Sequence, residues 1–180
     1  METKTISCQC GQVVMTATGA PIVRVQCYCH SCQEGGARLE ALPGAPPVRE
    51  ADGGTDYVLY RKDRVACMQG GDKLVELKLK PTSPTRRLAA SCCNTAMFLD
   101  VSKAHWVTFY RHRLADPVPP LALRSMTAER REGVTLPDDG VPAYPGRSGK
   151  FFGKLLGAWL AMGFRIPAVK GVPAHPPRLA

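Results

Sequence analysis

The segment Val25-Gln-Cys-Tyr-Cys-His-Ser-Cys-Gln33 is the stretch that we expect to organise the fold. It contains three thiols, Cys27, Cys29 and Cys32, within six residues. Cys29 and Cys32 form a C-x-x-C turn, which points both sulfurs the same way, and Cys27 can supply a third sulfur from the extended residues before it. This density of thiols predicts a zinc site. The stretch offers no fourth local ligand, and an open coordination position is typical of a reactive zinc site.

A second interpretation of the same cluster is a closed, structural zinc site. Its fourth ligand would then come from Cys67 or His30. Cys67 stands alone in a strand-like stretch, where a cysteine is usually a buried apolar residue. The other histidines, at positions 105, 112 and 175, have no ligand spacing with each other, and we expect them on the surface or in the core.

Length and cysteine usage limit the other roles of the thiols. A chain of 180 residues can bury a core without disulfides, as one domain or as one domain plus an appendage. Its first residues lack the pattern of a secretory signal, which predicts a cytoplasmic protein with reduced cysteines. All eight cysteines lie between positions 8 and 93 and are therefore interpreted as metal ligands or catalytic thiols.

Two further cysteine motifs flank the central one. Cys8-Gln-Cys10-Gly11 forms a turn at which two strands could meet. The adjacent pair Cys92-Cys93 precedes a turn at Asn94-Thr95.

The first 115 residues read as an antiparallel, mainly β unit, because short strands alternate with turn signals and no long helical period occurs. After the central cluster, Gly35-Gly36 argues against a long helix, so residues 33–41 are given one or two helical turns. Strands are expected at 13–17, 21–26, 57–60, 64–67, 74–79 and 105–110.

The remaining chain divides into two parts. Residues 116–147 are rich in proline and are predicted to be a linker or an arm that wraps the domain, with a short helix at 126–132. Residues 148–180 are predicted to form an amphipathic helix, at 148–166, and a tail. The domain boundaries are therefore 1–115, 116–147 and 148–180.

The helix at 148–166 has three candidate partners. Its apolar face could dock on the β domain, while small residues at every fourth position from Gly149 to Ala161 would allow a homodimer contact. Lys150, Lys154 and Arg165 would suit an anionic membrane surface. The apolar run is about 14 residues, short of the roughly 20 that cross a bilayer, so no transmembrane span is expected. The predicted apolar face comprises Phe152, Leu155, Leu156, Trp159 and Leu160.

The charge of the chain is concentrated towards its end. Residues 111–180 carry 11 Lys and Arg against 5 Asp and Glu, which is +6 of the net +9. A basic surface attracts anions of many kinds. Nucleic acid is not expected as a partner, because aromatic residues make up 7% of the chain and are not interleaved with Lys and Arg as base-stacking surfaces require.

The three cysteine motifs together resemble the glutathione-dependent formaldehyde-activating (GFA) and centromere protein V-like family. That family carries C-x-C-G near its start, C-x-C-x-x-C some twenty residues later and F-C-x-x-C-G-T near its end. The resemblance covers residues 5–110 and departs from the pattern in the third motif, where Ala90 takes the place of the first cysteine. It implies an antiparallel zinc-binding β-tent of the Mss-like or GFA-like kind, with a C-terminal helix added here.

The resemblance also implies ligands and an activity. Cys8, Cys10 and Cys93 would hold a structural zinc, with Cys92 substituting for the missing cysteine, and Cys27, Cys29 and Cys32 would hold a catalytic zinc. The implied activity is that of a carbon–sulfur lyase acting on adducts of glutathione, or a similar small thiol, with formaldehyde or small aldehydes. Arg24 or Arg38 could steer the thiol. The alternative is a non-catalytic, zinc-stabilised module that engages a protein or membrane partner through the basic C-terminal helix.

Overall fold

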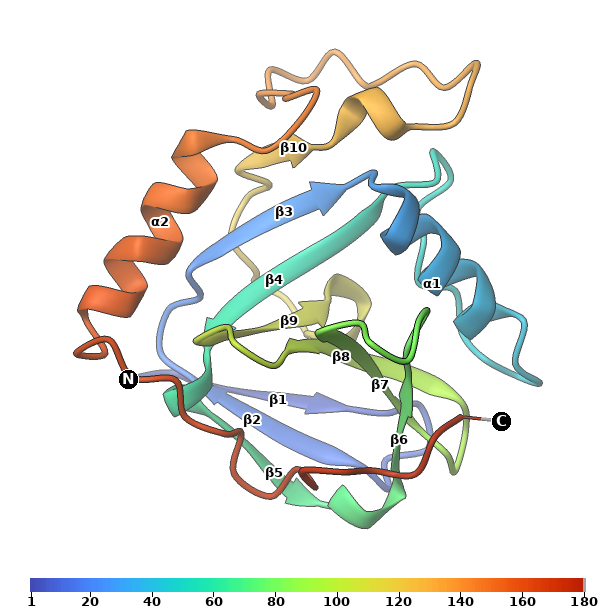
Figure 1. The fold of residues 1–180 in the computed structure, drawn as a ribbon, viewed down its shortest axis with the longest axis vertical. Helices are drawn as coiled ribbons and strands as arrows, with labels where there is room; N and C mark the ends of the chain where they lie inside the picture. Colours follow the sequence, from blue (N-terminus) through green and yellow to red (C-terminus); the bar gives the residue numbers. More distant parts are fainter. Residues whose placement is uncertain (180) are drawn as a thin grey trace.

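A computed structural model describes residues 1–179 as two β-sheets with two α-helices packed around them (Figure 1). One sheet has three strands in the order β1-β2-β5, and the other has seven in the order β10-β3-β4-β9-β8-β7-β6. Neighbouring strands are antiparallel except β10 and β3, so the predicted mainly β, mostly antiparallel fold with a C-terminal helix is confirmed. The elements are β1 Thr3–Ser7, β2 Val14–Thr18, β3 Val23–Cys27, α1 His30–Glu40, β4 Thr55–Arg61, β5 Val65–Gln69, β6 Leu74–Leu77, β7 Thr85–Ala90, β8 Thr95–Val101, β9 Trp106–Tyr110, β10 Leu123–Ser125 and α2 Gly149–Leu160.

The seven-stranded sheet is buried on both faces. One face packs against the three-stranded sheet, in a core that includes Val58, Phe98 and Met15. The other face lies under the helices, in a core that includes Leu59 and Leu155. Because successive side chains of a strand point to opposite faces, β4 is buried along almost its whole length.

Double burial explains why β7 and β8 are absent from the strands predicted from the sequence. Both strands are apolar in consecutive positions, which removes the alternation that identifies a half-buried strand. Arg87 on β7 further obscures the pattern, because it is 2% exposed although it is charged. The two strands form a hairpin whose turn carries Cys92 and Cys93.

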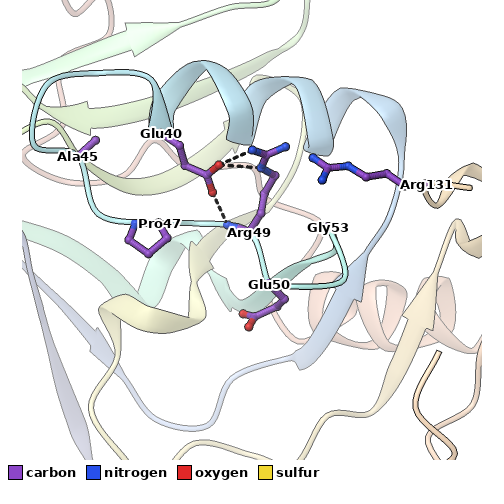
Figure 2. A pocket seen from close by; sticks show the side chains of 7 residues that line it. All are labelled: Glu40, Ala45, Pro47, Arg49, Glu50, Gly53 and Arg131. Atoms are coloured by element: carbon purple, nitrogen blue, oxygen red, sulfur yellow. Dashed lines mark hydrogen bonds and ion pairs between the residues drawn. The ribbon is translucent and has the colours of Figure 1, made fainter. Parts of the chain in front are cut away.

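The prediction of only one or two helical turns after the central cluster is wrong, because α1 runs for 11 residues. Gly35 and Gly36 in this helix allow two arginine side chains to pack closely against its backbone. A Cβ atom at Gly35 would overlap the guanidinium Nε of Arg87, and one at Gly36 would lie 2.7 Å from Cγ of Arg49. Arg49 in turn pairs with Glu40 at the end of the helix, at the side of a polar pocket (Figure 2).

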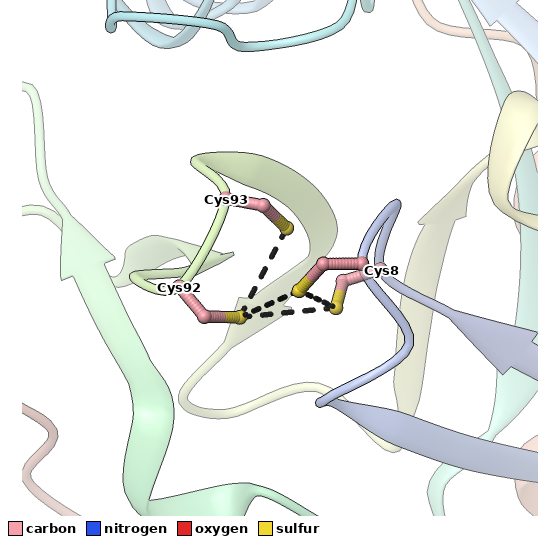
Figure 3. A group of neighbouring side chains, drawn as sticks. Cys8, Cys92 and Cys93 are labelled. Atoms are coloured by element: carbon pink, nitrogen blue, oxygen red, sulfur yellow. Dashed lines mark hydrogen bonds between the residues drawn. The ribbon is translucent and has the colours of Figure 1, made fainter.

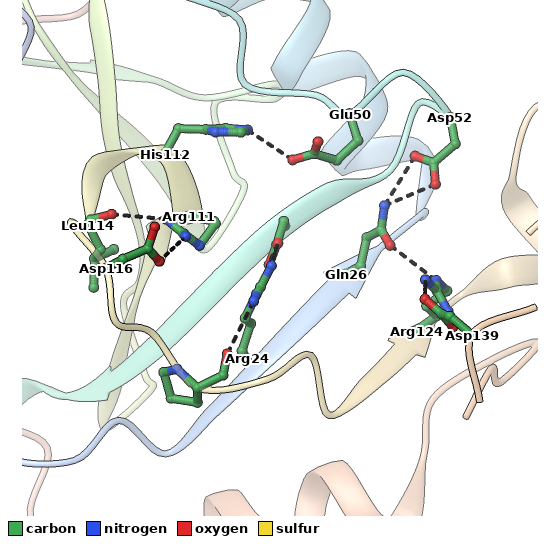
Figure 4. A network of polar contacts seen from close by, with 12 residues as sticks. Arg24, Gln26, Glu50, Asp52, Arg111, His112, Leu114, Asp116, Arg124 and Asp139 are labelled. Carbon is green, nitrogen blue, oxygen red and sulfur yellow. Dashed lines mark hydrogen bonds and ion pairs between the residues drawn. The ribbon is translucent and has the colours of Figure 1, made fainter. Parts of the chain in front are cut away.

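The proline-rich arm contributes a strand. In β10, Arg124 donates a hydrogen bond to Gln26 on β3 and pairs with Asp139 of the arm (Figure 4). Gln26 also donates to Asp52 in the loop before β4, so one network of hydrogen bonds and ion pairs holds arm, sheet and loop together. The helix expected at 126–132 is a single 3-10 turn, Thr127–Glu129. Whether the three predicted segments fold as separate units stays a prediction.

Helix α2 packs on the seven-stranded sheet and is shorter than the predicted 148–166. It ends at Leu160, and Gly163 and Phe164 then adopt positive φ angles of 62° and 58°. The predicted apolar face is divided, since Leu155 is 3% exposed and Leu156 is 51% exposed. His105 bonds through Nε2 to the Leu155 carbonyl oxygen and stacks on Trp159. None of the helices in residues 1–179 has the length and apolar character needed to cross a membrane.

The tail beyond α2 runs along one edge strand of each sheet, β5 and β6. The backbone N–H of Cys67, on β5, donates to the carbonyl oxygen of Lys170 at 2.8 Å. On β6, the N–H of Glu76 donates to the carbonyl oxygen of Pro177, also at 2.8 Å. β5 and β6 are the outermost strands of their sheets, and the tail therefore lies along an edge of each.

Gly35→Ala should destabilise the protein by about 1–3 kcal/mol, because the added methyl group displaces a buried arginine in a packed core. The matched control is Gly153→Ala in α2, where a Cβ atom meets nothing within 4 Å. There the gain in helix propensity should stabilise the protein by up to about 1 kcal/mol. Urea denaturation of both variants measures the difference, and equal stability of the two would contradict this packing role.

Candidate metal centres

Two groups of cysteines come together in the structure, on opposite faces of the seven-stranded sheet. Cys8, Cys10, Cys92 and Cys93 form a four-cysteine cluster, and Cys27, Cys29 and Cys32 form a three-cysteine cluster. Within each cluster the sulfur atoms all lie within 4.8 Å of one another. The first cluster adjoins the core between the sheets, and the second adjoins the core under the helices.

The four-cysteine cluster joins two sheets. Cys8 and Cys10 lie in the turn between β1 and β2, and Cys92 and Cys93 lie in the turn between β7 and β8 (Figure 3). The sulfur of Cys92 is 3.3 Å from that of Cys10, 3.9 Å from that of Cys8 and 3.9 Å from that of Cys93. A tetrahedron of thiolates at the Zn–S distance of about 2.3 Å has edges of about 3.8 Å. The cluster therefore has the size of a zinc site.

Adjacent cysteines reach one cluster because the hairpin turn is sharply bent. Asn94 has a φ angle of 52°, in the left-handed region that asparagine tolerates better than most residues. The side chain of Thr95 holds the neighbouring turn, since its Oγ1 accepts a hydrogen bond from the N–H of Gln9 at 3.2 Å. This bend brings the sulfurs of Cys92 and Cys93 to the same side of the chain.

The surroundings of the four-cysteine cluster shift the pKa values of Cys8 and Cys93 in opposite directions. Burial raises the pKa of the Cys8 thiol. Burial alone would also raise the pKa of Cys93, but hydrogen bonds from Thr95 and Cys10 lower it to about 6. A thiolate at Cys93 is thus favoured at neutral pH, and a bound cation would favour the thiolate form of Cys8.

The three-cysteine cluster lies where β3 passes into α1. Cys27 is the last residue of the strand, Cys29 is the N-cap of the helix and Cys32 lies in its first turn. The unpaired N–H groups and the dipole of a helix N-terminus favour negative charge, which suits thiolates. Hydrogen bonding to Cys29 raises the pKa of Cys27 well above its ordinary value, and hydrogen bonds from Cys27 and Cys32 hold that of Cys29 well below it.

Neither fourth ligand proposed for a closed site joins this cluster. Within residues 1–179, the group of metal-ligating atoms consists of the three cysteines alone. Cys67 lies on β5 of the other sheet and contacts the carbonyl oxygen of Gln69. The His30 side chain is 82% exposed and faces Glu129 at 3.8 Å.

The three-cysteine cluster opens into an apolar cavity of about 320 Å³ between the sheet and α2. Among its polar lining residues are Tyr57, which is buried, and Arg147, which is exposed. Burial raises the pKa of Tyr57 well above its usual value, so its hydroxyl stays protonated. The lining comprises the three cysteines with Val25, Tyr57, Leu59, Leu99, Val101, Trp106, Thr108, Ser125, Met126, Arg147, Phe151 and Phe152.

A buried arginine lies beside the same cluster. Nη2 of Arg87 donates a hydrogen bond to the carbonyl oxygen of Ser31, the residue before Cys32, and its Nε has no partner. Within residues 1–179, Arg87 pairs with no carboxylate. A buried charge is costly unless it is compensated. Three thiolates around a divalent cation carry one net negative charge, which would compensate the guanidinium.

Sequence reasoning missed Tyr57, Arg87 and Arg147 at this site, because β4, β7 and the arm reach it only through the fold. The two arginines that it suggested for steering a thiol lie elsewhere. Arg24 is held by Asp56 and by the carbonyl oxygen of Pro119, and Arg38 pairs with Glu34 on the surface of α1.

Comparison with known proteins supports the resemblance found in the cysteine motifs. Residues 3–43, which include the first two motifs, match the family model of the glutathione-dependent formaldehyde-activating enzyme. No curated protein matches the chain. The crystal structure of a Rhodobacter sphaeroides protein, a structural-genomics target, is similar with 14% sequence identity and a TM-score of 0.44, covering 78% of this chain and 99% of that chain. The likeness to the GFA family is thus confirmed over its first two motifs.

Cys8→Ser and Cys10→Ser should each give unfolded or insoluble protein, because zinc binding at a structural site contributes on the order of 10 kcal/mol to folding. Cys67→Ser is the matched control, since Cys67 lies outside both clusters. Soluble yield, zinc content and melting temperature measure the effect. Variants of Cys8 and Cys10 that melt at the temperature of the control would show that this cluster is not a structural metal site.

Proposed function

We propose that this protein binds two zinc ions and catalyses the formation or cleavage of adducts between a small thiol and an aldehyde. In this proposal Cys8, Cys10, Cys92 and Cys93 hold a structural zinc, and Cys27, Cys29 and Cys32 hold a reactive one. The observation that carries it is a group of three cysteines, without a fourth protein ligand in residues 1–179, beside an apolar cavity. The similarity of residues 3–43 to the GFA family supports the same chemistry.

The reaction joins a thiolate sulfur to an aldehyde carbon. The thiol loses its proton, a carbon–sulfur bond forms and the carbonyl oxygen takes up a proton, which gives an S-hydroxyalkyl thiol; the lyase direction is the reverse. A zinc ion bound by three thiolates would supply a lowered pKa for the substrate thiol and a fixed position for its sulfur. The reducing conditions that keep all these thiols free are those of the cytoplasm, where we propose that the protein acts.

The chain itself supplies a proton donor and a screened site. Tyr57 lines the cavity and stays protonated, so its hydroxyl can donate a hydrogen bond to the aldehyde oxygen as negative charge develops there. The apolar walls keep water from the adduct, which strengthens that hydrogen bond. Arg147 at the mouth can attract an anionic group at the free end of a bound thiol.

Cobalt substitution tests the open position of the three-cysteine site. Addition of millimolar 2-mercaptoethanol or glutathione should change the thiolate charge-transfer bands and removal should restore them, because a substrate thiol enters the coordination shell. Cys32→Ser should abolish the response. Cys67→Ser and His30→Ala are the controls and should leave it intact, since neither side chain joins the cluster. A spectrum unaffected by thiols, in protein that holds two metals per chain, would exclude the proposed activity.

A second candidate function is attachment to an anionic membrane surface, and the outer side of α2 favours it. Five large apolar side chains are 45–55% exposed on α2 and just beyond it. Lys150, Lys154 and Arg165 accompany them, and the sequence has six Lys and Arg but no Asp or Glu after residue 139. Such a surface suits insertion at a lipid headgroup layer. The same face on a second copy would bring like charges together, which disfavours a symmetric dimer. The five residues are Phe152, Leu156, Leu160, Phe164 and Ile166.

Sedimentation with lipid vesicles tests this candidate. The protein should bind vesicles that contain phosphatidylserine, more weakly at high salt, and bind neutral vesicles at least about tenfold less. Leu156→Glu should reduce the binding, whereas Met68→Glu, also at an exposed apolar residue but on β5, should not. A concentration-dependent dimer that Leu156→Glu dissociates, with no vesicle binding, would assign the face to a second copy instead.

A further inference from the structure

The cavity beside the three-cysteine cluster has almost no charge of its own. Phe151 and Phe152 close it from α2, and Leu99 and Trp106 line it from the sheet. Apart from the cysteines, Arg147 is the one charged side chain among the described residues that line it, and because Arg147 is exposed the positive charge lies at the mouth. A volume of about 320 Å³ is within the range of small-molecule sites.

The walls determine which substituent a bound thiol can carry. A ligand whose sulfur reaches the three cysteines must place its other atoms along these apolar side chains. Glutathione has two carboxylates and an ammonium group. Apart from the cysteines, the described residues that line the interior offer no charged side chain to pair with any of them. Burial of such groups without partners is unfavourable. Burial of an alkyl or aryl group at the same place contributes about 25 cal/mol per Å².

We propose that the three-cysteine site takes thiols with an apolar alkyl or aryl substituent in preference to glutathione. The inference rests on the proposed function for the entry of a thiol beside the cysteines. The preference itself follows from the cavity. The free end of the substituent would lie towards the mouth, where Arg147 is exposed.

A single tryptophan can report on the cavity. The chain has two tryptophans, Trp106 and Trp159, and only Trp106 lines this cavity. Trp159→Phe retains an aromatic ring against His105 and leaves Trp106 as the sole tryptophan, which can be excited selectively over tyrosine. Binding of an aryl group should then shift or quench the emission.

The experiment compares 2-phenylethanethiol, 2-mercaptoethanol and glutathione on cobalt-substituted Trp159→Phe protein. The charge-transfer bands report entry of the sulfur, and Trp106 fluorescence reports occupancy of the cavity. We expect 2-phenylethanethiol to bind at least about tenfold more tightly than glutathione, the discrimination that a few methylene contacts provide. The alcohol 2-phenylethanol has the same aryl group but no thiol, and it should still change the Trp106 fluorescence of the zinc protein.

A pair of variants assigns the preference to the cavity wall. Phe151→Ala should weaken 2-phenylethanethiol about tenfold and leave glutathione unchanged, because it removes an apolar contact that only the aryl group makes. Met68→Ala, at an exposed residue on another sheet, should change neither affinity. Melting temperatures establish that both variants are folded.

The outcomes separate this inference from the function on which it rests. Cobalt bands that respond to glutathione as strongly as to 2-phenylethanethiol, with no effect of Phe151→Ala, would overturn the preference and leave thiol chemistry intact. Bands that respond to no thiol would overturn both. Tighter binding of the aryl thiol, lost in Phe151→Ala, would establish the apolar substrate class.

Discussion

The structure depends on the four-cysteine cluster, in which sulfur atoms from turns of the two sheets come into contact. The turn after β1 and the turn after β7 each contribute two cysteines, and their sulfurs must lie within 4.8 Å of one another. Closely spaced thiolates repel unless a cation lies among them, so the geometry of these turns and the binding of a metal are linked. The apolar core between the sheets lies directly against this junction, since it includes Cys8 and is packed against Cys92 and Cys93.

The seven-stranded sheet then separates two chemical environments. Its face toward the smaller sheet holds the four-cysteine cluster, whose turns are fixed by the packing of two sheets. Its other face holds the three-cysteine cluster, which faces a cavity that α2 closes. Strands β4, β8 and β9 contribute side chains to the cores on both faces, because alternate residues of a strand point in opposite directions. A sheet that is buried on both faces thus positions the three-cysteine cluster beside a cavity that a ligand can enter.

Sequence patterns predicted the ligand groups better than they predicted the framework. Cysteine spacing is local for the central cluster, and so its three members were identifiable directly. The association of Cys8 and Cys10 with Cys92 and Cys93 came from family resemblance, because 84 residues separate Cys8 from Cys92. Strands β7 and β8 were missed, since burial on both faces leaves no alternation, and the length of α1 was missed because its glycines serve contacts with distant arginines. The cavity could not be foreseen at all, because its walls come from six separate stretches of chain.

The C-terminal tail covers the edge strands β5 and β6 and so hinders their pairing with other copies of the chain. An outermost strand presents unpaired backbone groups that can template pairing with another chain, which leads to aggregation. Here the outermost strands β5 and β6 donate backbone hydrogen bonds to Lys170 and Pro177, and the N–H of Leu179 returns a bond to Glu76. The proline-rich composition of the tail stops it from becoming a full strand with a new exposed edge of its own. A protein truncated after α2 would therefore expose the edges of β5 and β6, and it would aggregate more as its concentration rises.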